Sequence, residues 1–275
     1  MTEPSALAGT AAGVPFVALP PAGGARPARV VVLWHLLGTP GTPAAMAAAL
    51  PLRDVPAWRV YLELPGTGSR APAAAWPEFL LETDLLLDAY GPIVEGAAGE
   101  LPAVLTKLRT ELPLGEGPIA LVGGSAGGHA ALLTLLRADL EVSAAVLVNP
   151  AVRAETVITV NERLADFRYP WTDAPRTAAA RLDMLTAPAG NPGAAVLLVT
   201  GSEEYPEFQP DQSDLCDVLA RRSPAPERVD HHVLPGVAHM FAEQPGDPPD
   251  AAAIDAEATA WLRRYFAPGD GTKDS

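Results

Sequence analysis

The chain has 275 residues, of which 48% are hydrophobic, 19% are charged and 6% are aromatic. This composition provides a sizeable core for one domain and excludes a disordered or coiled-coil chain. The formal net charge of −14 repels phosphate groups, so we expect neither nucleic acid nor an anionic membrane surface among the partners.

The location of the protein is predicted from its cysteine content and its first residues. Cys216 is the single cysteine and cannot form an internal disulfide, which is typical of a reducing compartment. No Lys or Arg precedes Arg26, unlike in a secretory signal peptide. We therefore expect a cytoplasmic protein, and the sequence gives no indication of its oligomeric state.

Mainly apolar blocks of strand length recur along the chain. They are Val30–Trp34, Trp58–Leu62, Ile119–Val122, Ala144–Val148, Ala195–Val199 and, less purely, Val229–Leu234. Between and after them, two sets of residues follow helical spacing, namely Leu101, Leu105, Leu108 and Leu112, and then Ile254, Trp261, Leu262 and Tyr265. Continuous apolar strands that alternate with helices predict an α/β fold, with a mostly parallel twisted sheet and helices on both faces.

One long connection interrupts this alternation. Residues 151–192 contain no clear strand but include Phe167, Tyr169 and Trp171. A connection of this length indicates either a lid or binding insertion, or a surface elaboration. We predict a single domain over residues 1–275, with a short cap-like insertion at about 151–192 between core strands.

The strongest local signal surrounds Ser125. Residues 117–136 are uncharged, as in a membrane span, but four glycines within six positions predict a strand, a turn and a helix instead. Gly123 and Gly127 flank Ser125 at minus two and plus two, which is the pattern of a nucleophile elbow. The alternative is an anion-binding loop, but neither G-x-G-x-x-G nor a P-loop Lys-Ser/Thr pair is present.

A serine nucleophile needs a base, and five histidines are available. His239 follows the last predicted strand, where its loop opens at the same sheet edge as Ser125. His231 and His232 are consecutive in a strand and face opposite sides, so we interpret both as structural or exposed. His129 is a weaker candidate, expected to pack or hydrogen-bond beneath the turn. No H-E-x-x-H motif or Cys/His cluster occurs, so we expect no metal.

The base in turn needs an acid that orients it. Glu204 follows the strand before the one that leads to His239, and it is our first candidate. Glu203 is the reserve and Asp211 the third choice. The chain order Ser125, Glu204, His239 is the order of serine, acid and base in one particular fold.

These features resemble the α/β-hydrolase family. Residues 63–70, Glu-Leu-Pro-Gly-Thr-Gly-Ser-Arg, resemble a loop that follows a central strand in many members, and residues 31–39 resemble the strand and oxyanion loop that precede it. The matches run in the family's order from about residue 30 to 242. Asn149-Pro150 occupies the position that holds the acid in some members, and a neutral Asn there supports Glu204.

The resemblance implies a serine esterase or thioesterase that acts on a small-molecule acyl substrate without a cofactor. It assigns Ser125, Glu204 and His239 to a catalytic triad, and Ala126 N–H to the oxyanion hole. His35-Leu36 replaces the usual His-Gly, so the second N–H comes from Leu36 or Leu37, of which we favour Leu37.

The same scaffold supports other functions. An acyltransferase would use the same triad, as would a peptidase or a carbon–carbon hydrolase. A non-catalytic ligand-binding protein on a hydrolase scaffold is a different class. Leu36 in the oxyanion loop is the sequence feature that favours such a non-catalytic protein.

Overall fold

The structure is a computed structural model. It describes residues 6–21, 26–73, 83–137, 139–188, 190–244 and 251–266.

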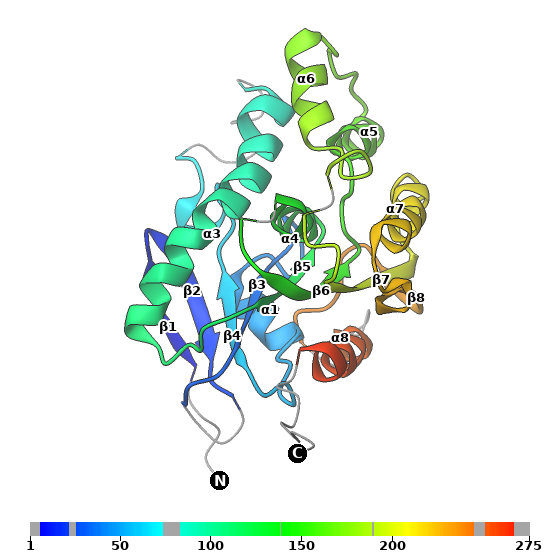
Figure 1. Cartoon of the computed structure of the whole chain (residues 1–275). Coiled ribbons are helices and arrows are strands. Elements are labelled where there is room, and N and C mark those ends of the chain that lie inside the picture. Colours follow the sequence, from blue (N-terminus) through cyan, green and yellow to red (C-terminus); the bar gives the residue numbers. More distant parts are fainter. Residues whose placement is uncertain are drawn as a thin grey trace.

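One eight-stranded sheet forms the centre of the molecule, in the order β1-β2-β4-β3-β5-β6-β7-β8 (Figure 1). Its strands are β1 (Leu7–Ala11), β2 (Val14–Leu19), β3 (Val30–Trp34), β4 (Trp58–Leu62), β5 (Ile119–Gly124), β6 (Val142–Val148), β7 (Ala195–Glu203) and β8 (Val229–Ala238). The strands from β4 to β8 in this order pair in parallel, and the β1–β2 and β2–β4 pairs are antiparallel. The predicted α/β class with a mostly parallel sheet is confirmed, and each predicted block lies within one of the strands.

The N-terminal hairpin of β1 and β2 was not among the predicted elements. Ala12 and Gly13 form its two-residue turn, with φ of 50° and 86°, and such a turn favours glycine. Four of the five residues of β1 are exposed, so this strand has no apolar run that would reveal it. The hairpin extends the sheet at one edge.

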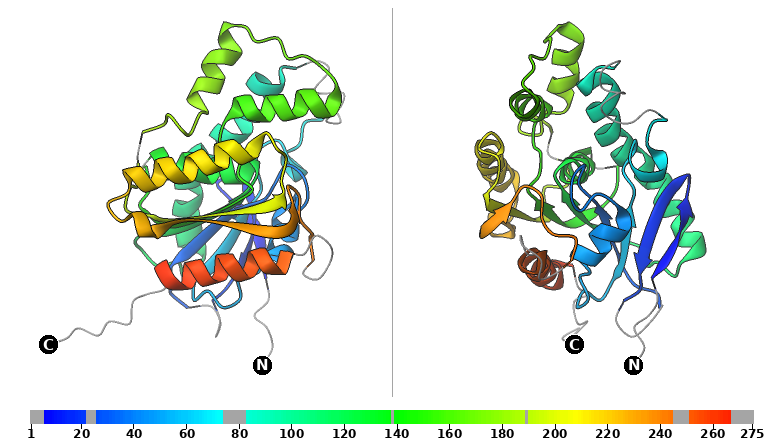
Figure 2. Two further views of the ribbon diagram at one scale, coloured as in Figure 1. Left: turned by 90° about the vertical axis from the view of Figure 1, so that its right-hand side faces the viewer. Right: turned by 180° about the vertical axis from the view of Figure 1, so that it is seen from behind.

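Helices cover both faces of the sheet, as Figure 2 shows. They are α1 (Pro43–Ala49), η1 (Gly68–Arg70), η2 (Leu85–Tyr90), α3 (Gly91–Glu111), α4 (Ala126–Arg137), α5 (Ala154–Ala165), α6 (Asp173–Arg181), α7 (Phe208–Arg222), η3 (Pro226–Arg228) and α8 (Ala251–Tyr265). The core on one face includes residues of α3, α4 and α7, and the core on the other includes residues of α1 and α8. The sheet is thus buried between two apolar layers, as its continuous apolar strands require.

The helix predicted from the spacing of Leu101, Leu105 and Leu108 is α3, which continues through Pro102 in its interior. It directly follows η2, a π-helix whose first turn is capped by the carboxylate of Asp84. The uncharged stretch 117–136 forms β5, a turn and α4, in agreement with the sequence. Among the helices of the described residues, none combines the length and the hydropathy needed to cross a membrane.

Helices α5 and α6 come between β6 and β7 along the chain. They lie on the side of the molecule away from α8 (Figures 1 and 2). The hydroxyl of Tyr169, between the two helices, donates to the carboxylate of Asp84. Arg163 of α5 pairs with Glu207, just before α7. These contacts hold the two helices to η2 on one side and to α7 on the other.

His232 of β8 lies between two carboxylates, those of Glu257 in α8 and Asp230. His232 Nδ1 donates to Glu257 of α8 at 2.8 Å, and Nε2 donates to Asp230 at 3.2 Å. Burial lowers the pKa of His232, but these hydrogen bonds outweigh burial and raise the pKa overall. A raised folded pKa means that the protonated ring stabilises the fold fully below the unfolded pKa, and that this contribution is lost as the pH rises through the folded pKa.

We therefore expect His232→Gln to lower the free energy of unfolding more at pH 6 than at pH 9, as measured by urea denaturation. His231→Gln is the matched control, because burial lowers the pKa of His231. This substitution should lower the free energy of unfolding less at pH 6 than at pH 9. Equal losses at both pH values in the two variants would contradict this account.

Candidate active site

Ser125 occupies a strained turn between β5 and α4. Its φ is 49°, which a residue other than glycine adopts rarely. A Cβ on Gly123 would lie 2.2 Å from the Gly127 carbonyl oxygen, and a Cβ on Gly127 would lie 2.4 Å from the His35 carbonyl oxygen. Because backbone atoms would have to move, both flanking positions require glycine. Such a turn presents the serine hydroxyl above the sheet.

The hydroxyl of Ser125 meets the ring of His239. The distance from Ser125 Oγ to His239 Nε2 is 2.9 Å, and His239 follows β8 directly. The rings of Tyr205 and Phe208 pack against the imidazole, with centroids 5.0 Å and 5.1 Å away. These two aromatic side chains restrict the rotation of the imidazole.

The carboxylate of Glu204 lies on the other side of the imidazole. His239 Nδ1 donates to Glu204 Oε1 at 2.8 Å and is 3.0 Å from Oε2. Oε1 also accepts from the Tyr205 N–H at 2.6 Å, and Oε2 accepts from Gln212 Nε2 at 3.3 Å. The Glu204 side chain is fully buried. A hydroxyl, an imidazole and a carboxylate joined in this order form the arrangement that activates serine for acyl transfer.

The two other candidate acids lie elsewhere. Glu203 is the exposed last residue of β7. Asp211 on α7 accepts a hydrogen bond from Thr156 and lies 3.7 Å from the Arg153 guanidinium. Of the three acids that the sequence singles out, the structure therefore brings Glu204 to His239.

His129 lies beneath the turn, fully buried in α4. The Tyr90 hydroxyl is 2.8 Å from its Nδ1. Burial lowers the pKa of His129 to about 3. His129 is therefore a neutral core residue, in agreement with the packing role expected from the sequence.

The loop after β3 is held by a second buried histidine. His35 Nδ1 donates to the Leu36 carbonyl at 2.6 Å, and Nε2 accepts from the Leu64 N–H at 3.2 Å. Burial lowers the pKa of His35, which favours the neutral ring that these two bonds require. His35 thus fixes the start of the loop that carries Leu36 and Leu37.

Leu36 and Leu37 differ in where their backbone and side chains lie. The Leu36 N–H donates to the Pro40 carbonyl at 3.1 Å, and its buried side chain fills the space above Gly124, where a Cβ would be 2.3 Å from Leu36 Cδ1. Leu37 is exposed, and its N–H has no hydrogen-bond acceptor among the residues that the structure describes. Ala126 begins α4, so its N–H is one of the helix's unpaired donors.

Three residues of the site were not found from the sequence: Tyr205, Phe208 and Gln212. Phe208 and Gln212 stand four and eight residues after Glu204, which is the spacing of one helix face. The helix that carries them, α7, was not predicted, and this spacing was the available signal. In the part of the chain that the structure describes, no group of three or more His, Cys, Asp or Glu side chains could hold a metal ion.

The steric role of Gly127 can be tested against another helical glycine. Gly127→Ala should reduce stability, because its Cβ would meet the backbone of Trp34 and His35. Gly99 in α3 is the control, since a Cβ there meets nothing within 4 Å, and Gly99→Ala should stabilise by up to about 1 kcal/mol through helix propensity. Thermal unfolding measures both variants, and a Gly127→Ala variant as stable as Gly99→Ala would contradict the steric account.

The buried His129 predicts an acid-sensitive fold. Its folded pKa of about 3 lies below the unfolded value near 6.5, so the unfolded chain binds a proton that the folded chain does not. The free energy of unfolding should therefore decrease as the pH is lowered below about 6.5, and this group contributes up to about 1.4 kcal/mol per pH unit. Urea titrations should show the difference in unfolding free energy between wild type and His129→Gln becoming smaller at that rate between pH 6.5 and pH 5. A difference that does not change with pH would be inconsistent with a neutral buried His129.

Comparisons with known proteins identify the family of the chain. The family model "Esterase", described as "Putative esterase", matches residues 96–252, which is more than half of the chain and includes Ser125, Glu204 and His239. A comparison with curated protein sequences gives no match.

Solved structures share the fold at low sequence identity. The protein TT1662 from Thermus thermophilus is 18% identical with a TM-score of 0.67, and the match covers 94% of this chain and 98% of that one. A hyperthermophilic esterase from the archaeon Pyrobaculum calidifontis is 17% identical with a TM-score of 0.62, over 94% and 85% of the two chains. An S-formylglutathione hydrolase from Staphylococcus aureus is 13% identical with a TM-score of 0.55, over 94% and 95%.

These neighbours and the eight-stranded sheet show the α/β-hydrolase fold. The chain therefore belongs to this esterase family and is a hydrolase of the α/β-hydrolase type, as the sequence predicted.

Proposed function

We propose that the protein is a serine hydrolase that cleaves a carboxylic ester or thioester through an acyl-enzyme intermediate on Ser125. The observation that carries the proposal is the continuous hydrogen-bonded series of three side chains. Ser125 Oγ lies 2.9 Å from His239 Nε2, and His239 Nδ1 lies 2.8 Å from Glu204 Oε1. The three residues come from three separate segments of the chain, and their contact is difficult to explain by packing alone.

The reaction has two acyl-transfer steps. His239 Nε2 takes the proton of Ser125 Oγ as this oxygen bonds to the substrate carbonyl carbon, and the imidazolium then gives the proton to the departing alcohol or thiol. A water molecule, deprotonated in the same way by His239, attacks the acyl carbon. The bond to Ser125 Oγ breaks, the carboxylic acid leaves and Ser125 regains its proton.

Glu204 keeps the imidazole in the required tautomer. With the Nδ1 proton donated to the carboxylate, Nε2 carries the free lone pair toward Ser125. The carboxylate also accepts from the Tyr205 N–H and from Gln212, so it is fixed before the imidazolium forms. Glu204 stabilises that cation without moving.

The oxyanion is held by two backbone N–H groups, those of Ala126 and Leu37. Ala126 contributes a free donor at the N-terminus of α4. Leu37 is the second donor, because the Leu36 N–H already donates to Pro40. The Leu36 side chain is buried against Gly124 and leaves the Leu37 N–H without an acceptor among the described residues, so the replacement of the usual glycine does not favour a non-catalytic binding protein.

The substrate is a carboxylic ester or thioester of modest size with an apolar group. Leu37 is 45% exposed and Met240 is 42% exposed, and Met240 lies over Gly38, where a Cβ would be 2.3 Å from its Sδ. Two exposed apolar side chains thus adjoin the oxyanion loop and His239. The aromatic residues of the insertion pack inward instead, since Tyr169 is buried, and Phe167 and Trp171 contact the core.

Labelling with a fluorophosphonate probe, together with hydrolysis of p-nitrophenyl esters, tests the proposal. Ser125→Ala should abolish labelling, because the attacking oxygen is gone. Glu204→Gln should lower kcat/KM by about 10²–10⁴-fold, since the imidazole loses its orientation and its counter-charge. Glu203→Gln is the matched control and should change kcat/KM by less than about twofold, because Glu203 is exposed at the end of β7.

Labelling that persists in Ser125→Ala would disprove the assignment of the nucleophile. Equal losses in Glu203→Gln and Glu204→Gln would disprove the assignment of the acid. Product analysis with added alcohols separates hydrolysis from acyl transfer, and a product that is entirely the new ester would identify an acyltransferase that uses the same three residues.

A further inference from the structure

Asn149, the residue directly after β6, has every hydrogen-bonding group of its side chain in use. It is fully buried, with φ of 42°. Its Oδ1 accepts from the Gly201 N–H at 2.8 Å, and its Nδ2 donates to the carbonyls of Ala238 at 2.7 Å and His239 at 3.0 Å. The amide therefore joins the end of β6 to β7 and to the main chain of His239.

These bonds lie beside an irregular part of the pairing between β7 and β8. The regular pairing of β7 with β8 ends at Gly201 and Leu234, and the next pair is Glu203 with Ala238. The register shift leaves residues 235–237 of β8 outside the regular ladder, directly before Ala238 and His239. The Asn149 side chain supplies two hydrogen bonds just after this stretch, to the carbonyls of Ala238 and His239, from the end of β6, which is separated from β8 by β7.

The same strand end also holds the main chain of Ser125. The Ser125 N–H donates to the Val148 carbonyl at 3.0 Å, and the Ala151 N–H donates to the Ser125 carbonyl at 3.2 Å. Residues 148–151 thus bond to the backbone of both residues whose side chains meet at 2.9 Å. Asn149 provides the part of this connection that reaches His239.

The chemistry of the position restricts which side chain can do this. It must accept one hydrogen bond and donate two at the same time, and it must tolerate a positive φ. A carboxylate has no proton to donate, a serine hydroxyl has one, and β-branched residues disfavour this φ. Asparagine meets all these requirements.

We propose that Asn149 is a positioning residue that holds the main chain of His239, so that Nε2 stays within hydrogen-bond reach of Ser125 Oγ. The proposal rests on the proposed function for its kinetic consequence, but its geometric content stands separately. Asn149 has no role in binding the substrate, so its loss lowers kcat and leaves KM nearly unchanged.

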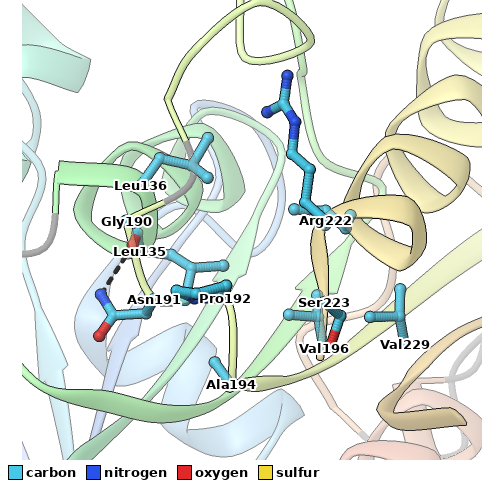
Figure 3. A pocket seen from close by; sticks show the side chains of 11 residues that line it. Leu135, Leu136, Gly190, Asn191, Pro192, Ala194, Val196, Arg222, Ser223 and Val229 are labelled. Carbon is cyan, nitrogen blue, oxygen red and sulfur yellow. Dashed lines mark hydrogen bonds between the residues drawn. The ribbon is translucent and has the colours of Figure 1, made fainter. Parts of the chain in front are cut away.

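Asn191 offers a matched control at the opposite end of β6. Its Oδ1 accepts from the Val142 N–H at 3.2 Å, and its Nδ2 donates to the carbonyls of Leu135 at 2.8 Å and Leu140 at 3.3 Å. This amide also makes one accepted and two donated backbone bonds, but it lines a small pocket near the starts of β7 and β8 (Figure 3). Losing it removes the same kind of cross-link far from Ser125.

The experiment compares wild type, Asn149→Gly and Asn191→Gly well below their unfolding temperatures, after circular dichroism has shown that each is folded. Glycine removes the side chain and keeps the positive φ free of strain at residue 149. Asn149→Gly should lower kcat for ester hydrolysis and the rate constant of fluorophosphonate labelling by at least about 30-fold, because small displacements of a reacting group cost about 100-fold. Asn191→Gly should lose thermal stability but keep both rates within about threefold of wild type.

Labelling and kcat of folded Asn149→Gly within threefold of wild type would overturn the proposal, as would equal rate losses in the two variants. If Asn149→Gly does not fold, Asn149→Ser takes its place, since it keeps a polar group but is too short to make both donated bonds. A wild-type protein that neither labels nor hydrolyses esters would refute the proposed function alone. The crystal structure of the variant then decides the role of Asn149: a His239 Nε2 to Ser125 Oγ distance beyond 3.5 Å supports it, and an unchanged distance refutes it.

Discussion

The hydrogen bond between Ser125 Oγ and His239 Nε2 is the contact on which the site depends. Its two residues are separated by 114 positions in the chain, and they meet because β5 and β8 end at the same edge of a parallel sheet. The contact is accompanied by a strained serine, an irregular stretch of β8 before His239, and the carboxylate of Glu204 behind the ring. The glycines around Ser125 and the irregular end of β8 are local features that serve this one contact.

The fold and the main residues of the site could be predicted because their signals are local. The continuous apolar run of residues 30–34 gave β3 residue for residue, since a strand buried on both faces leaves little room for polar residues. The mainly apolar run of residues 58–62 gave β4 equally well, although it includes the buried Arg59, whose guanidinium donates to the carbonyls of Val55 and Pro20. The glycine spacing around Ser125 reflects collisions with nearby backbone. Glu204 and His239, by contrast, were assigned from their order after Ser125 along the chain, which resembles that of the α/β-hydrolase family.

The remaining features depend on tertiary contacts that leave little trace in the sequence. The exposed strand β1 is defined by its partner β2 and not by its own composition. The choice between Leu36 and Leu37 depends on which N–H the Pro40 carbonyl accepts, and residue types do not reveal it. Gln212 reaches Glu204 from α7, a helix with few strong apolar signals. Such residues are defined by partners far away in the chain.

Leu36 and Gly124 share one volume. The Leu36 side chain occupies the place that any side chain at residue 124 would need. A large side chain at residue 36 therefore requires glycine at residue 124. A homologue with glycine at the position of Leu36 has space for a larger residue at the position of Gly124, next to the nucleophile, whereas a homologue with leucine does not. Residues 36 and 124 should therefore vary in a compensating manner during evolution. Replacing Leu36 by glycine alone would leave a void that enlarges the space around the nucleophile.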